Sequence, residues 1–411
     1  MSDGHAAPIT SSERIGELDA LRGFALLGVF IANYVWFAFL DWSATDADRD
    51  IFFTDPATMG VVNFVQLFVA DKANTLFATL FGIGFWIQMQ RVRARGADAD
   101  RIYLRRLSVL LVIGLINMLL IFPWDILFLY ALTGFALFAL RNLSMKAMLA
   151  LGLLCVAFAR PVIKGGYDLA GLRGPAMEEV WSEAATGARQ AAVLSGDYGA
   201  WVAEMARTNW FDFAVAGGLA AWIVYALGRF LVGAWIARHG WLERLDELRS
   251  ALGRIALVAL PLGLALEFLW MGNDWGYFEV PQLVGQGAHI LGSPITALGY
   301  ATGFLWLLQT KAMGWLPRIC APVGRMALTN YVAHGAILLF VLSGVGPGLA
   351  LAGTITPVQT LSLAIGVYVG LTIFSHFWLT TFRYGPLEYA WRTLTYGRAP
   401  AFRRKSALQD A

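Results

Sequence analysis

The chain has 411 residues, of which 58% are hydrophobic and 14% are charged, and its formal net charge is +3. Soluble domains carry about 45–50% apolar and about 25% charged residues, so this composition indicates a membrane protein and excludes disordered or collagen-like chains. The small net charge predicts no nucleic-acid partner. Two cysteines, Cys155 and Cys320, supply neither a disulfide framework nor a metal-ligand spacing, so no metal site is predicted.

Ten apolar runs approach the length of about 20 residues that a helix needs to cross a bilayer. The amino-terminal stretch before them holds acids and lacks the basic start of a signal peptide, so the first run is expected to stay in the mature protein. The runs predict an all-α polytopic membrane protein with about ten transmembrane helices in one domain. They lie near residues 19–40, 72–90, 107–122, 125–140, 145–162, 209–237, 254–272, 289–310, 323–345 and 357–381.

Lys and Arg divide unevenly between the segments that connect these runs. If both termini face the cytoplasm, the inner segments hold 23 basic residues and the outer segments hold five. Cytoplasmic segments of membrane proteins carry the excess of Lys and Arg. The sequence therefore predicts that the N and C termini are both cytoplasmic.

Three polar segments flank or separate the runs. Residues 163–207 have the spacing of one or two amphipathic helices and are expected to form a small extracytoplasmic helical cap. Residues 41–60 are rich in Asp and are expected to be a solvated loop, because they lack the ligand spacing of a calcium loop. Residues 383–411 predict a cytoplasmic interfacial helix, in which Glu388 can pair with Arg392, followed by a basic tail.

Polar side chains inside apolar runs are costly in lipid, so each is a candidate functional residue. In the first run, Asp19 and Arg22 are three residues apart and Asn33 lies eleven beyond Arg22, so all three share one helix face. This spacing predicts a paired Asp and Arg at the cytoplasmic mouth of the bundle, with a deep amide behind them. Such a pair either contacts a ligand or holds the first helix to its neighbours.

Further polar residues occur in the next runs. Arg106 and Asn117 are also eleven apart, which places Asn117 near the membrane middle. Asp125 begins the fourth run, where a carboxylate caps a helix and meets its positive dipole end. Lys72 begins the second run at the same outer level, so we expect Lys72 to interact with Asp125. Arg229 lies about 13 Å inside the membrane and needs a partner or a polar ligand.

The ninth run places Asn330 and His334 one turn apart on a single face near the middle of the span. A neutral imidazole can act as a general base or proton relay near physiological pH, which makes His334 the leading catalytic candidate. The alternative is a histidine whose nitrogens are satisfied by a hydrogen bond between helices. His289 and His376 rank lower because they lie near the ends of their runs.

Five segments carry a resemblance to a known family, and together they span nearly the whole chain. They are LDALRGFALLGVFIAN, KANTLFATLFGIGFWIQMQR, RRLSVLLVIGLINMLLIFPWDILFLYAL, GRMALTNY and FRYGPLEYAWRTLTY. With them the chain resembles the YeiB-like family of bacterial inner-membrane proteins, domain of unknown function 418. That family is similar, more distantly, to integral-membrane acyltransferases that use a cytoplasmic acyl donor to modify an acceptor on the far side. Its members have also been described as transporters.

The chain departs from the family pattern at two places. Asn117 stands where such proteins often have His before a Gly-Asp pair, and here Trp124 precedes Asp125. In the ninth run, His334 stands where Gln is common. Membrane acyltransferases usually rely on a His near the membrane, so the resemblance implies that His334 would act from a different helix.

The resemblance and the polar residues lead to three hypotheses of function. The first is an acyltransferase-like protein that moves an acyl group from a cytoplasmic donor such as acyl-CoA to an extracytoplasmic or lipid-linked acceptor. The alternatives are a transporter of a small organic or lipid-like solute and a noncatalytic lipid- or quinone-binding envelope protein. No cofactor is expected to be permanently bound. The expected partners are membrane lipids, acyl-CoA as co-substrate and, in a homodimer, a second copy of the chain.

The first hypothesis gives the candidate residues separate roles. Arg side chains at the cytoplasmic face suit the phosphate oxygens of acyl-CoA. His334 would deprotonate the acceptor, while Asn330 and Asn117 orient the acyl carbonyl. The residues expected to bind substrate are Asp19, Arg22, Asn33, Lys72, Arg106, Asp125, Arg229 and Arg325.

Overall fold

The computed structural model describes residues 15–36 and 44–404, and the regular elements in these ranges are helices. In chain order they are α1 (Gly16–Ala32), α2 (Asp46–Phe52), α3 (Pro56–Phe64), the π-helical turn η3 (Val65–Val69), α4 (Lys72–Ala94), α5 (Ala99–Leu120), α6 (Ile126–Ala139), α7 (Met145–Leu169), α8 (Arg173–Trp181), α9 (Glu183–Leu194), α10 (Tyr198–Thr208), the π-helical turn η4 (Asn209–Val215), α11 (Gly218–Arg238), η5 (Trp241–Glu243), α12 (Arg249–Asp274), α13 (Gln282–Leu308), η6 (Lys311–Met313), α14 (Leu316–Arg325), α15 (Ala327–Leu342), α16 (Pro357–Thr381) and α17 (Pro386–Tyr396).

Within the described ranges, seven helices are long and apolar enough to cross a membrane, namely α1, α5, α7, α11, α12, α13 and α16. Two bent pairs of helices, α2 with α3–α4 and α14 with α15, contain the runs predicted near 72–90 and 323–345. The run near 125–140 is the 14-residue α6. Each predicted run therefore coincides with a helix as far as it is described, since residues 37–40 of the first run lie outside the described residues, and the chain is an all-α multi-pass membrane protein.

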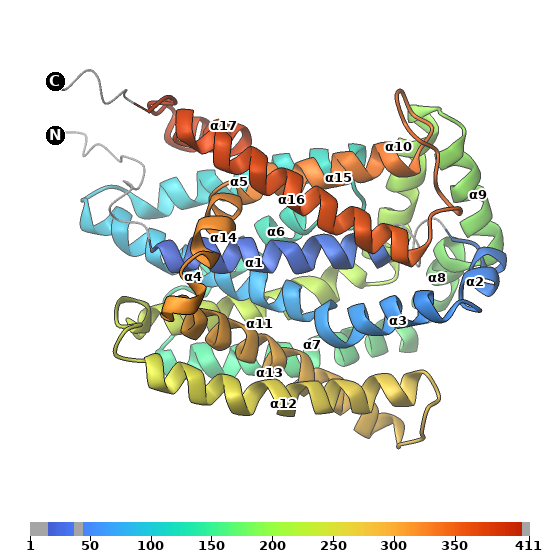
Figure 1. The fold of residues 1–411 in the computed structure, drawn as a ribbon, viewed down its shortest axis with the longest axis horizontal. Coiled ribbons are helices and arrows are strands. Elements are labelled where there is room, and N and C mark those ends of the chain that lie inside the picture. The colour runs from blue at the N-terminus through green and yellow to red at the C-terminus, as the bar shows by residue number, and fades with distance from the viewer. Residues whose placement is uncertain (1–14, 37–43, 405–411) are drawn as a thin grey trace.

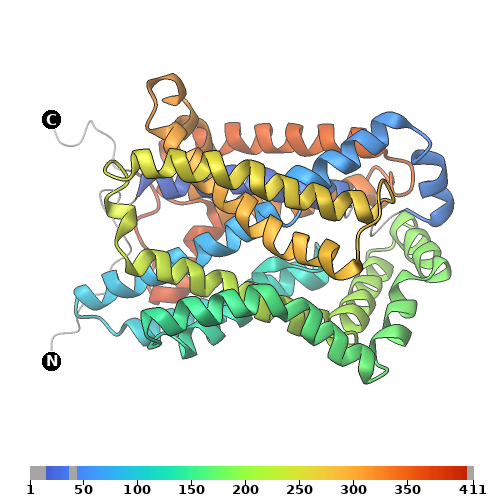
Figure 2. The ribbon, with the colours of Figure 1, turned by 90° about the horizontal axis from the view of Figure 1, so that it is seen from below.

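The connections between the helices gather at two ends of the bundle (Figure 1). α1 begins at one end, where α17 and the junction between α4 and α5 also lie, and we call this the basic end because Arg91, Arg93 and Arg95 close α4 there. α2, α8, α9 and α10 lie together at the opposite end, which we call the cap end. The α12–α13 hairpin runs along one side of the bundle (Figure 2).

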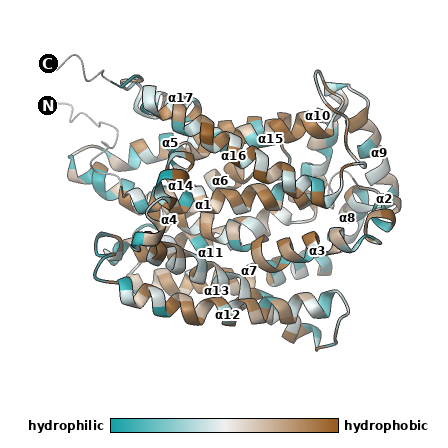
Figure 3. Cartoon of the chain, in the orientation of Figure 1, coloured by the Kyte–Doolittle hydropathy of each residue, from teal (hydrophilic) through white to brown (hydrophobic). Residues whose placement is uncertain are grey.

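Apolar side chains dominate the middle of the bundle, and hydrophilic residues gather toward its ends (Figure 3). Large apolar residues are exposed on the outer helices, for example Val162 on α7 at 65%, Leu257 on α12 at 76% and Phe377 on α16 at 68%. Exposed apolar surface of this extent is unfavourable in water but favourable against lipid. The outward-facing sides of these helices therefore match a hydrocarbon environment.

The segments expected to be polar loops contain more helix than the sequence predicted. The interval 163–207 begins inside α7 and continues as three short helices, α8, α9 and α10, where one or two were expected. In the acidic segment, Thr45 and Asp48 form a capping box at the start of α2, and Asp55 caps α3. Residues 41–43 of that segment and 405–411 of the basic tail lie outside the described residues.

Candidate functional site

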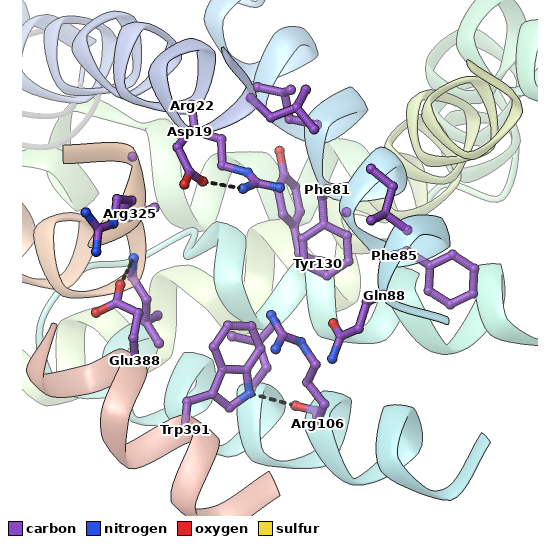
Figure 4. Close-up of a pocket in the computed structure, with 18 of the residues that line it drawn as sticks. Asp19, Arg22, Phe81, Phe85, Gln88, Arg106, Tyr130, Arg325, Glu388 and Trp391 are labelled. Carbon is purple, nitrogen blue, oxygen red and sulfur yellow. Dashed lines mark hydrogen bonds and ion pairs between the residues drawn. The ribbon is translucent and has the colours of Figure 1, made fainter. Parts of the chain in front are cut away.

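A cavity of about 250 Å³ lies at the basic end of the bundle, and we call it the arginine cavity (Figure 4). α1, α4, α5, α6, α14, α15 and α17 all contribute to its wall. Five arginines line it, namely Arg22, Arg91, Arg106, Arg325 and Arg392. Two carboxylates, Asp19 and Glu388, line it as well.

A close crossing of α1 and α14 brings part of this lining together. A Cβ atom on Gly23 would lie 2.0 Å from the carbonyl oxygen of Cys320, and one on Gly324 would lie 1.8 Å from that of Asp19. Only glycine fits at such a distance, as at the small-residue crossings common between membrane helices. The crossing places Arg325, the neighbour of Gly324, beside the first turns of α1.

Inside the arginine cavity, the predicted pair is confirmed: Arg22 donates a hydrogen bond of 2.9 Å to Asp19. The Arg106 guanidinium carbon lies 3.6 Å from the centroid of the Trp391 ring, and the Trp391 indole donates to the Arg106 carbonyl at 2.9 Å. These contacts fix one guanidinium from α1 and one from α5 against the cavity. Arginine in such an arrangement suits phosphate oxygens.

Glu388 has a different partner from the one that its spacing predicted. Its Oε1 accepts hydrogen bonds from the backbone N–H groups of Leu328 at 2.7 Å and Thr329 at 3.1 Å, and its Oε2 accepts from the Thr329 hydroxyl at 2.6 Å. The carboxylate therefore caps the start of α15 from α17. Burial raises the pKa of the Glu388 carboxyl above its usual 4.5, although the bonds from Thr329 and Leu328 oppose this rise.

The arginine cavity becomes apolar with depth. Phe77 on α4 lines it fourteen residues before Arg91, which corresponds to about 21 Å along the helix. The centroid of the Tyr130 ring lies 6.2 Å from that of the Phe77 ring, and Leu110 and Leu127 also line the cavity. A ligand that binds here would meet cationic groups at the basic end and aromatic or aliphatic groups inside.

A second cavity, of about 440 Å³, lies toward the cap end, and we call it the cap cavity. Its volume falls within the range of about 300–1,000 Å³ typical of small-molecule sites. Five tryptophans line it: Trp36, Trp124, Trp181, Trp222 and Trp270. The polar side chains of its lining are Asn33, Gln66, Asp71, Asn74, Arg160, Asp212 and His289.

Unusual backbone conformations are concentrated around the cap cavity. Asp71 and Trp124 are two of the three non-glycine residues with positive φ in the described ranges, at 61° and 52°. Three π-helical turns, at residues 33–36, in η3 and in η4, also contribute lining residues. A positive φ at a non-glycine residue costs about 1–3 kcal/mol and is found preferentially at functional sites, and π-helical turns are also frequent there. The cap cavity is therefore the part of the molecule where backbone strain indicates a function.

A chain of five charged or ionisable side chains borders the cap cavity. Arg160 donates to both oxygens of Asp71, each at 3.1 Å. His289 bridges two carboxylates, with Nε2 3.1 Å from Asp71 and Nδ1 3.1 Å from Glu267. Glu267 also accepts from the Lys72 ammonium, and neither Lys72 nor Glu267 is exposed. We call this set the charged chain, and it joins α4, α7, α12 and α13.

The expected contact between Lys72 and Asp125 is wrong, because each side chain has other partners. Lys72 pairs with Glu267, and Asp125 accepts from the Asn117 amide at 2.9 Å and from the Phe128 N–H at 2.8 Å. Helix length placed Lys72 and Asp125 at one level of the membrane but could not show which helices are neighbours. Asp125 does cap α6, as predicted.

A wall of hydrogen-bonded side chains separates the two cavities. Tyr130, which lines the arginine cavity, donates a hydrogen bond of 2.8 Å to the side-chain oxygen of Asn74, which lines the cap cavity. Tyr331 lines the arginine cavity as well, and its hydroxyl accepts from the N–H of Ile126, a residue of the cap cavity, at 3.3 Å. At these points a single hydrogen bond connects the two linings.

His334 lies within this wall. The Asn33 amide lies 3.0 Å from its Nε2, its Nδ1 is bonded to the Tyr331 carbonyl, and its ring stacks on Phe30 with centroids 4.4 Å apart. The side chain is fully buried and lines neither cavity. Both ring nitrogens have partners, which is the arrangement of a histidine satisfied between helices. A catalytic role for His334 stays a prediction.

The structure brings four of the predicted residues together in the wall. Tyr331 connects them, because it contacts both His334, the partner of Asn33, and Asp125, the partner of Asn117.

Two further predicted residues line neither cavity. Asn330 donates to Ser375 at 2.9 Å, and Arg229 bonds to the Tyr225 carbonyl at 3.3 Å and to the Thr75 hydroxyl at 3.5 Å. The Asn330 amide is thus satisfied by neighbours, whereas the Nη2 atom of Arg229 is buried without a hydrogen-bond partner among the described residues.

The sequence interpretation selected neither the three lining residues Asp71, Arg160 and Asp212 nor Glu267 of the charged chain, although a signal was present for each. Arg160, Asp212 and Glu267 are ionisable residues inside predicted apolar runs, and Asp71 directly precedes Lys72. An ionisable residue in such a run is a functional candidate by default. The same rule that selected Lys72 and Arg229 would have selected these residues.

Comparison with known proteins identifies relatives along the whole chain. Residues 236–398 match a family described as "Protein of unknown function (DUF418)". The chain is 30% identical to the uncharacterized protein YeiB of Escherichia coli (strain K12), in an alignment that is 417 positions long with its gaps and covers 96% of this chain and 100% of that protein. It is 29% identical to the uncharacterized protein YxaH of Bacillus subtilis (strain 168), with 95% of this chain and 96% of that protein covered.

Proposed function

This chain belongs to the YeiB-like family of unknown function, DUF418, and we propose that it transfers an acyl group from a cytoplasmic acyl-CoA to an acceptor in the cap cavity. One observation carries the proposal: two cavities of different chemistry approach each other from opposite ends of the bundle and share a hydrogen-bonded wall. The proposal places the chain in the bacterial inner membrane with both termini in the cytoplasm. The basic end then faces the acyl donor.

The arginine cavity suits the donor. Phosphate groups of acyl-CoA would bind the guanidinium groups of Arg22, Arg106 and Arg325, since arginine binds phosphate oxygens through two parallel hydrogen bonds. The thioester arm would follow the apolar lining of Phe77 and Tyr130 toward the wall. Burial of this arm away from water protects the thioester from hydrolysis.

The cap cavity suits an acceptor that carries a hydroxyl or amine. In the transfer, the acceptor oxygen or nitrogen forms a bond to the acyl carbon, the carbon–sulfur bond breaks, and coenzyme A leaves with a proton on its sulfur. The carbonyl oxygen gains negative charge in the transition state, which amide N–H groups such as those of Asn33 and Asn74 can stabilise. His334 holds the Asn33 amide in place and so acts as a positioning residue in this scheme.

The test is to incubate the purified protein with acetyl-CoA and to measure release of free thiol. Arg106→Gln should lower the rate and the protection from heat that coenzyme A provides, whereas Arg101→Gln, on the exposed side of α5, should change neither. Absence of thiol release with several acyl donors, together with no protection from heat by coenzyme A, would contradict the proposal.

A transporter of a small organic or lipid-like solute is the second candidate. Two cavities separated by a closed wall are also the arrangement expected of one state of an alternating-access carrier, and buried ionisable chains such as that of Lys72, Glu267 and His289 mark ion pathways in transporters. Solute flux into proteoliposomes that needs no acyl donor would favour this candidate. Mass spectrometry of co-purified lipids or quinones would test the noncatalytic alternative.

A further inference from the structure

Four ionisable side chains line the cap cavity within the described residues: Asp71, Arg160, Asp212 and His289. Three of them belong to the charged chain. Asp71 accepts two hydrogen bonds from Arg160 and one from His289, and the second nitrogen of His289 is bonded to Glu267. Their hydrogen-bonding capacity is thus used within the protein, and a proton acceptor for a ligand must be sought elsewhere.

Asp212 is the remaining ionisable group of this lining. It lies in the π-helical turn η4, which ends before Gly217 at a φ of 76°. A Cβ atom on the next residue, Gly218, would lie 2.6 Å from the Asp212 carbonyl oxygen, so the Gly-Gly pair permits the turn. The membrane span α11 begins only at Gly218, which leaves Asp212 outside it, at the edge between span and cap.

Asp212 has cationic residues in its surroundings, but it forms no ion pair with any residue in the described part of the chain. Burial raises the pKa of the Asp212 carboxyl above its usual 3.8. The Trp124 side chain and the positive charges of Lys164 on α7 and Arg173 on α8 oppose this rise in pKa. A carboxylate that is desolvated but not neutralised by a cation is a better proton acceptor than a solvated one.

Three observations therefore converge on one residue: its position in the lining of the cap cavity, its place in a π-helical turn, and the absence of an ion pair in the described residues. We propose that Asp212 is the general base of the cap cavity and accepts the proton of the acceptor's hydroxyl group. The inference rests on the acyl transfer proposed above. As the acceptor oxygen bonds to the acyl carbon, its proton passes to the Asp212 carboxylate and the carbon–sulfur bond breaks. The coenzyme A thiolate then takes a proton from water at the basic end, and the protonated Asp212 carboxyl returns its proton to water at the cap end, which restores the base.

The experiment uses acetyl-CoA as the donor and compares two acceptors, one that needs a general base to attack the thioester and one that does not. Water needs a base to attack a thioester, whereas hydroxylamine is a strong nucleophile near neutral pH. In Asp212→Asn, thiol release to water should fall by about 10²–10⁴-fold, the usual contribution of a general base, while formation of acetohydroxamate should fall much less. The rising limb of the wild-type rate against pH, which reports ionisation of Asp212, should disappear in the variant.

Two further variants separate chemistry from structure. Asp212→Ala should regain part of its activity when sodium formate is added, because formate can replace the missing carboxylate, and a purely structural role would not allow this. Asp50→Asn removes an exposed carboxylate on α2 and should behave as the wild type. Equal losses with water and hydroxylamine, or an unchanged rate in Asp212→Asn, would overturn the assignment of the base while acyl transfer stands. A wild-type protein that acylates neither acceptor would overturn both proposals.

Discussion

The two cavities are built in different ways. The arginine cavity includes the 81° bend between α14 and α15, but none of its lining residues has a positive φ, and the close approach of α1 and α14 requires only the glycines Gly23 and Gly324. The cap cavity is formed where helices are interrupted, and Asp71 and Trp124 adopt left-handed conformations there. Binding a polyanion requires several cations within reach, which regular helices can supply, whereas acid–base chemistry requires a few groups in fixed positions. The contrast matches a donor site at one end and a reaction site at the other.

Substitutions in the charged chain should have the largest effect on the stability of the protein around the cap cavity. Lys72→Met would leave Glu267 charged and buried without its ammonium partner, and loss of one member of a buried pair costs about 3–5 kcal/mol. The double variant Lys72→Met with Glu267→Leu should recover most of this loss. Unfolding in detergent measures both. The exposed pair of Arg244 and Glu247 is the control, and Glu247→Gln should leave the midpoint unchanged. A stable single variant would show that the charged chain does not support the cavity.

Substitutions in the arginine cavity should lower the affinity for coenzyme A more than they lower the free energy of unfolding. Arg22→Gln removes a charged hydrogen-bond donor worth about 1.5–3 kcal/mol toward a phosphate, which should raise the dissociation constant for coenzyme A about 10- to 150-fold. Calorimetry at two salt concentrations checks this, because the wild-type affinity should fall more steeply with salt than that of the variant. If Arg22→Gln binds coenzyme A as tightly as the wild type does, the acyl donor does not bind in the arginine cavity.

Loss of one hydroxyl from the wall that separates the cavities should lower stability and admit water. Tyr130→Phe removes the hydrogen bond to Asn74 and should cost about 0.5–1.5 kcal/mol in unfolding free energy. With the wall loosened, water enters more easily, so the ratio of acyl-CoA hydrolysis to transfer should rise. Tyr277→Phe, which changes an exposed hydroxyl bonded to Asn63 at the cap end, is the matched control. An unaltered ratio would mean that the wall does not control access of water.

The smallest effect is expected at Glu388, in the dependence of stability on pH. Burial raises its pKa in the folded protein above 4.5, so the folded state binds this proton more tightly than the unfolded state does. The contribution is fully present below pH 4.5 and is lost as the pH rises through the raised pKa. Glu388→Gln should flatten this part of the curve of melting temperature against pH. Parallel curves for wild type and variant would contradict a raised pKa.

The sequence by itself determined where the long apolar helices lie and which residues share a face of one helix. The bilayer demands long apolar runs with internally bonded backbones, so the ten runs could be located without any tertiary information. The pairing of Asp19 with Arg22 followed for a similar reason, because the helical repeat alone places residues three apart on one face.

The tertiary structure decided which helices meet, and with them the partners of Lys72, Glu388 and His334. Lys72 finds Glu267, 195 residues away, and Asn33 finds His334, 301 residues away. Hydropathy reports how deep a residue lies in the membrane, but not the order of the helices around the bundle or the direction in which a side chain points. The cap cavity therefore stayed hidden, because its polar groups come from separate helices and its strained turns carry no periodic pattern from which they could be predicted.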